Sequence, residues 1–61
     1  MKSTLRGIRS NKKMTQRQAG AQVGVSEKTW FNWENGKSYP NAPQVDEILK
    51  TFNVSYEDVI F

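Results

Sequence analysis

The chain contains no cysteine and no histidine, and these two absences remove most enzyme chemistry from consideration. Without cysteine it can form neither a disulfide framework nor a thiolate nucleophile. Without histidine it lacks the usual general base and a common transition-metal ligand. Asp46-Glu47 and Glu57-Asp58 are adjacent carboxylate pairs of the kind found on solvated helix faces, and there is no Gly-rich phosphate loop. We therefore expect no enzyme, no metal and no cofactor, and no small-molecule ligand is evident.

Long apolar runs are also absent. No stretch approaches the roughly 20 apolar residues that a membrane span needs. Met1–Thr4 leads into a mixed polar stretch and not into the apolar segment of a signal peptide. We expect one domain over residues 1–61, without membrane contact, in the bacterial cytoplasm or nucleoid. A chain this short buries only roughly 60% of its unfolded surface, so its stability should be marginal.

Positive charge is concentrated in the first half of the chain. Nine basic and six acidic residues give a net charge of +3. Residues 1–28 hold seven bases and one acid, whereas residues 29–61 hold two bases and five acids. A basic half on a small domain is typical of proteins that bind a polyanion such as nucleic acid. Charge alone leaves a merely solvated basic face as an alternative.

Residues that start and stop helices alternate along the chain. Thr15 and Gln18 have the spacing of a capping box, which predicts a helix from Gln16 to about Val23. Similar signals bound four more short helices and predict an all-α fold of five helices without strands. The other predicted caps are Ser3 or Thr4, Ser26, Asn41 (with Pro43 in the first turn) and Ser55, and the predicted stops are Gly24, Gly36 and Asn53.

The second and third predicted helices, 16–23 and 27–35, have only three residues between them. So short a connection forces a sharp crossing, which is typical of a helix-turn-helix. Gly24 supplies the positive φ that the turn requires. Ala19 and Gly20 supply small side chains where the two helices approach, although glycine costs up to about 1 kcal/mol of helix propensity.

The predicted helix 27–35 has one apolar and one polar face. Trp30 and Trp33 fall on one side, which favours core packing over stacking on single-stranded bases. Lys28, Phe31, Asn32 and Asn35 fall on the other side, with Glu27 near its edge. The predicted core consists of Leu5, Ile8, Ala19, Val23, Val25, Trp30, Trp33, Val45, Ile48, Leu49, Phe52 and Val59.

The stretch from Thr15-Gln16 through Ala19-Gly20, Val23–Ser26, Trp30 and Trp33–Lys37 to Pro40 resembles the Cro and phage-repressor (XRE) family of helix-turn-helix domains. Phe52–Ile60 is similar to the closing helix of that family. The resemblance implies a compact five-helix, lambda-repressor-like domain that binds operator DNA as a dimer. The chain departs from the family pattern at Ala19, Gly20 and Phe31, where the family usually has a larger aliphatic residue, alanine, and a small or polar residue.

The resemblance also implies roles for individual residues. Lys28 can donate to guanine and Asn32 can pair with adenine, and both project from the polar face of helix 27–35. Thr29 could contact a thymine methyl group or pack at the helix edge, and Glu27 is better explained by the helix dipole. Matching positions in the family predict a structural ion pair between Arg9 and Glu34. The predicted base contacts are Lys28, Thr29, Asn32 and Phe31, and the predicted phosphate contacts are Gln16, Arg17, Asn35, Lys37, Ser38 and Tyr39.

The sequence thus predicts a transcriptional regulator, a repressor of phage or bacterial origin, with residues 27–35 in the major groove of double-stranded DNA. The apolar residues Tyr56, Ile60 and Phe61 predict a homodimer on the operator. The alternative is a protein-interaction module on the same fold, antitoxin-like or scaffold, which uses Phe31 and the apolar C-terminus. The sequence leaves open the operator and the direction of regulation.

Overall fold

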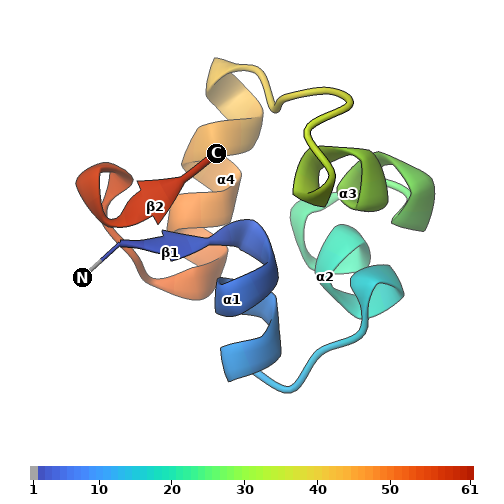
Figure 1. The fold of residues 1–61 in the computed structure, drawn as a ribbon, viewed down its shortest axis with the longest axis horizontal. Helices are drawn as coiled ribbons and strands as arrows, with labels where there is room; N and C mark the ends of the chain where they lie inside the picture. The colour runs from blue at the N-terminus through green and yellow to red at the C-terminus, as the bar shows by residue number, and fades with distance from the viewer. Residues whose placement is uncertain (1) are drawn as a thin grey trace.

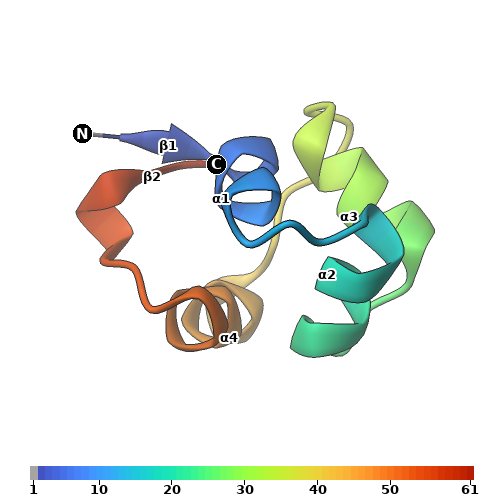
Figure 2. The same ribbon diagram turned by 90° about the horizontal axis from the view of Figure 1, so that it is seen from below.

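A computed structural model describes residues 2–61. Helices α2 (Gln16–Val23) and α3 (Glu27–Glu34) lie together on one side, α4 (Ala42–Phe52) and the C-terminal segment lie on the other, and α1 (Leu5–Asn11) lies between them (Figure 1, Figure 2). None of the helices within 2–61 has both the length and the hydropathy to cross a bilayer. In chain order the elements are β1 (Ser3–Thr4), α1 (Leu5–Asn11), α2 (Gln16–Val23), α3 (Glu27–Glu34), α4 (Ala42–Phe52), the 3₁₀ segment η1 (Tyr56–Asp58) and β2 (Val59–Ile60).

Each α-helix begins at a polar cap, as predicted. The Thr15 hydroxyl accepts the Gln18 amide at 3.1 Å, and the Gln18 side chain accepts the Thr15 amide at 2.9 Å. Asn41 and Gln44 form a second capping box at the start of α4. These bonds satisfy amides that the helix itself leaves without partners. Thr4 and Ser26 cap α1 and α3 with a single bond each, because their hydroxyls accept the amides of Gly7 and Thr29.

All four α-helices end in the same motif. In each, a residue with positive φ follows the helix, and the next amide bonds back to a carbonyl of the last turn. The predicted stops at Gly24, Gly36 and Asn53 are confirmed, with φ of 80°, 71° and 54°. The fourth stop is Lys13, with φ 57°, which no sequence signal marked. A left-handed conformation costs a residue with a Cβ about 1–2 kcal/mol.

The core is centred on Trp30, which is fully buried. Its ring lies 5.8 Å from the rings of both Trp33 and Phe52, so it joins α3 to α4. Val25 and Leu49 are half-buried and pack against the core, and Val45 is half-buried. The other nine predicted core residues are confirmed as buried: Leu5, Ile8, Ala19, Val23, Trp30, Trp33, Ile48, Phe52 and Val59.

Two predictions about the ends of the chain are wrong. The fold does contain strands, because Ser3 pairs with Val59 and Thr4 pairs with Ile60 in a short parallel ladder (Figure 1). The predicted fifth helix is only the three-residue segment η1, and the Ser55 side chain makes no capping bond. The chain must become extended at Val59 to pair with β1 and to bury that side chain. Long-range pairing therefore overrides the local helix signal, and residues 2–61 form four α-helices.

Candidate nucleic-acid interface

Helices α2 and α3 are held at a close crossing by the turn between them. The Val25 amide donates to the Gly20 carbonyl at 2.8 Å, which draws the turn onto the last part of α2. A Cβ at Gly20 would lie 2.9 Å from the Val25 carbonyl oxygen and 3.0 Å from that of Ser26. Glycine in place of the usual alanine thus leaves room for the backbone of the turn. Gly24 adopts the positive φ predicted for it.

The outer face of α3 carries the side chains predicted to read bases. Lys28 is exposed, Asn32 is half-buried, and Phe31 is 41% exposed, while Trp30 and Trp33 point inward. Thr29 is half-buried, and its hydroxyl lies 3.0 Å from the Ser26 hydroxyl that caps the helix. The outer face is therefore open to a ligand at Lys28 and Phe31, whereas Thr29 already has a partner at the start of the helix.

The loop after α3 folds back over that helix. The Lys37 amide donates to the Asn32 carbonyl at 2.9 Å, and the Lys37 ammonium lies 5.7 Å from the centre of the Phe31 ring. The Asn35 side-chain amide donates to the Phe31 carbonyl at 2.8 Å. Ser38 and Tyr39 are exposed. Two of the predicted phosphate contacts, Asn35 and Lys37, thus have partners within the domain.

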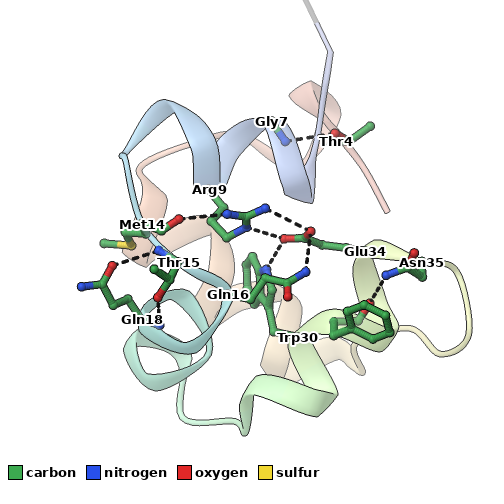
Figure 3. Close-up of polar contacts among 11 residues, drawn as sticks. Thr4, Gly7, Arg9, Met14, Thr15, Gln16, Gln18, Trp30, Glu34 and Asn35 are labelled. Atoms are coloured by element: carbon green, nitrogen blue, oxygen red, sulfur yellow. Dashed lines mark hydrogen bonds and ion pairs between the residues drawn. The ribbon is translucent and has the colours of Figure 1, made fainter.

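A buried carboxylate, Glu34, joins the first three helices (Figure 3). Arg9 of α1 donates to it from Nε at 2.7 Å and from Nη2 at 3.4 Å, so the structure brings together the two residues predicted to pair. Gln16, at the start of α2, donates at 3.1 Å, and the Trp30 indole also donates. Arg9 also donates from Nη1 to the Met14 carbonyl at 2.9 Å. The Glu34 cluster, defined as Arg9, Gln16, Trp30 and Glu34, therefore fixes α3 against α1 and α2.

The surroundings of Glu34 affect its ionisation in opposite directions. Burial by itself raises the pKa of the carboxyl group, because a charge loses its hydration. Hydrogen bonds from Arg9, Gln16 and Trp30, together with the Arg9 charge, lower the pKa by more. The net result is a Glu34 pKa below its ordinary value, so the carboxylate is ionised at neutral pH.

Gln16 occupies a different environment from the one predicted. It was expected to contact phosphate, but it is half-buried and its side-chain amide donates to Glu34. Its spacing of 18 residues from Glu34 gives no local sign of this contact. The Trp30–Glu34 contact, by contrast, joins residues four apart on one helix, a spacing that could have indicated it. Arg17, next to Gln16, is exposed.

Comparison with known proteins agrees with this geometry. A family model described as a helix-turn-helix domain matches residues 3–60. The chain belongs to the helix-turn-helix domain family. Two curated relatives match the domain over 56 residues, or 92% of the chain. One is the HTH-type transcriptional activator BcrR of Enterococcus faecalis, which is 36% identical. The other is the antitoxin PezA of Streptococcus pneumoniae, which is 32% identical.

Both relatives are much longer than this chain. The match spans 28% of the activator and 35% of the antitoxin. No solved structure matches the domain significantly. What the domain shares with these relatives is therefore one helix-turn-helix unit, and the remaining two thirds or so of each relative lie outside the match.

Proposed function

We propose that this helix-turn-helix domain binds double-stranded DNA in a sequence-specific manner, as a Cro- or phage-repressor-type regulator of transcription. The observation that carries the proposal is the division of α3 into two faces. Trp30 and Trp33 fix one face in the core, and Lys28, Phe31 and Asn32 lie on the other. A helix held this way can enter the major groove with its outer face toward the bases.

The spacing along the outer face suits neighbouring base pairs. Lys28 and Asn32 are one turn apart, about 6 Å along the helix axis. This is close to two base steps of about 3.4 Å. Lysine can donate to guanine O6 and N7, and asparagine can pair with adenine N6 and N7. In this proposal Lys28, Asn32, Thr29 and Phe31 of the segment 27–35 contact base edges.

Exposed basic and polar groups beside α3 would hold the DNA backbone. Arg17, Lys28 and Lys37 are exposed, and within residues 2–61 the one ion pair is that of Arg9 with Glu34. The exposed cations are thus not neutralised by carboxylates of the described chain, and they can pair with phosphates. The proposed phosphate contacts are Gln16, Arg17, Asn35, Lys37, Ser38 and Tyr39.

The C-terminal end of the domain supports association of two copies on DNA. Tyr56 is 67% exposed and Ile60 is 50% exposed, and the Tyr56 ring lies 5.9 Å from that of Phe61. Apolar groups left in water favour burial against a partner. We propose a homodimer that binds two half-sites about one DNA turn apart. The likeness to Cro and phage repressors supports repression as the role.

A protein-interaction module is the second candidate. One relative of the same domain is an antitoxin, and Phe31, Tyr56 and Ile60 are exposed apolar side chains. In that case these side chains would contact a protein partner, and affinity for DNA would be slight.

The experiment that separates the candidates is selection from random duplex DNA, followed by fluorescence anisotropy titrations at several salt concentrations. A DNA-binding domain should yield a consensus site and lose affinity steeply as salt rises. Asn32→Ala should weaken the selected site by about 1–3 kcal/mol and flatten the preference at one base pair. Lys37→Ala should weaken all sequences alike and lower the salt slope by about one. Absence of a consensus site and of salt-dependent binding would favour the interaction module.

A further inference from the structure

Phe31 is the one large apolar side chain on the outer face of α3. Lys28, Phe31, Asn32 and Asn35 fall within about 100° of arc on that face. The two tryptophans of the same helix are buried in the core, but the Phe31 ring is 41% exposed. Phe31 is not a member of the buried core. An apolar ring between polar side chains is suited to an apolar feature of the surface that the helix contacts.

The position of Lys37 beside the ring is set by the way the chain leaves the end of α3. The motif that closes α3 places Gly36 at φ 71° and binds the Lys37 amide to the Asn32 carbonyl at 2.9 Å. The Lys37 ammonium then lies over the ring, 5.7 Å from its centre. A cation at this distance is attracted to the negative face of an aromatic ring. The domain therefore presents an apolar ring and a positive charge side by side, with the ring nearer the helix.

Double-stranded DNA offers a matching pair of features. In the major groove the chief apolar group is the methyl at C5 of a pyrimidine, which is thymine or 5-methylcytosine, and phosphates line the groove. We propose that Phe31 recognises a pyrimidine C5 methyl group, while Lys37 beside it pairs with a phosphate of the DNA. This inference rests on the proposed function and adds the chemical group that is read.

The size of the effect follows from the area of one methyl group. Burial of a single methyl-sized group contributes about 0.8 kcal/mol, which corresponds to an affinity change of about fourfold. The strength of a contact between Lys37 and a phosphate does not depend on whether a nearby base carries a methyl group. The ratio of affinities for methylated and unmethylated sites therefore isolates the role of Phe31 from that of Lys37.

The test uses the duplex selected by the wild-type domain. Each thymine in turn is replaced by uracil, and each cytosine in turn is replaced by 5-methylcytosine. We expect one position per half-site where the methyl strengthens binding by about fourfold, and the two sets of duplexes show which methylated base supplies it. Phe31→Ala should reduce that ratio to about one. Lys37→Ala is the matched control, because it should weaken both duplexes by the same factor and keep the ratio. Thermal unfolding confirms that both variants are folded.

Each outcome of these binding measurements either supports or contradicts the inference about Phe31. A methyl effect that disappears in Phe31→Ala and persists in Lys37→Ala supports it. If the wild type binds duplex DNA with no methyl-sensitive position, or if Phe31→Ala keeps the ratio, the inference is wrong and the proposed function stands. If the wild type binds no duplex DNA at all, both the inference and the proposed function are wrong.

Discussion

The Glu34 cluster predicts a large loss of stability on truncation of a single carboxylate. The Glu34 side chain is only 4% exposed and that of Arg9 only 15% exposed. Within the described residues no buried side-chain polar atom lacks a partner. Glu34→Ala would leave a guanidinium, an amide and an indole N–H without their acceptor. Removal of one member of a buried ion pair costs about 3–5 kcal/mol, against about 0–1 kcal/mol for an exposed pair.

That loss is large for a domain of this size. At about 0.05–0.15 kcal/mol per residue, the whole domain has about 3–9 kcal/mol of stability. The assay is urea unfolding followed by tryptophan fluorescence, since Trp30 itself donates to Glu34. Glu34→Gln keeps one acceptor oxygen and should lose less than Glu34→Ala. Glu47→Ala, at an exposed position of α4, is the control and should change stability by about 0.5 kcal/mol or less. A loss below about 1 kcal/mol in Glu34→Ala would refute the reasoning.

The Glu34 cluster also predicts how the stability of the domain depends on pH. The Glu34 pKa is lower in the folded domain than its ordinary value of 4.5. Its contribution to stability is therefore fully present above about pH 4.5 and is lost as pH falls through the lower, folded value. The stability difference between the wild type and Glu34→Gln should shrink over that acid range. A difference that stayed constant down to pH 2 would show that the carboxylate has no special interaction in the folded state.

Three further substitutions test the core, the turn and a helix end. Trp33→Ala should cost about 3–5 kcal/mol, and a variant that melts like the parent would place Trp33 outside the core. Gly20→Ala should destabilise by about 1–2 kcal/mol despite its better helix propensity, because the new methyl would lie 2.9 Å from the Val25 carbonyl oxygen; a gain in urea midpoint would contradict this. Lys13 has a φ of 57°, which glycine adopts without a steric clash, so Lys13→Gly should stabilise the domain by up to about 1 kcal/mol. Lys12 has a φ of −89°, so Lys12→Gly should not stabilise it.

The sequence by itself determined the helices and the turn between α2 and α3. Capping residues act on amides three positions away, and a glycine with positive φ needs no distant partner, so these signals operate within one turn of chain. The tryptophan face of α3 could likewise be predicted, because helical periodicity alone places Trp30 and Trp33 on one side. The predicted pair of Arg9 and Glu34 came from family resemblance, since nothing in their local sequence indicates it.

Only the tertiary structure decided how distant segments meet. Pairing of Thr4 with Ile60 replaced a predicted helix by a strand, and the hydrogen bond from the Gln16 side chain to Glu34 joins residues 18 positions apart. In each case the outcome depends on a hydrogen bond or a buried side chain that another element contributes. Local sequence does not encode that contribution, because it exists only after the helices have packed.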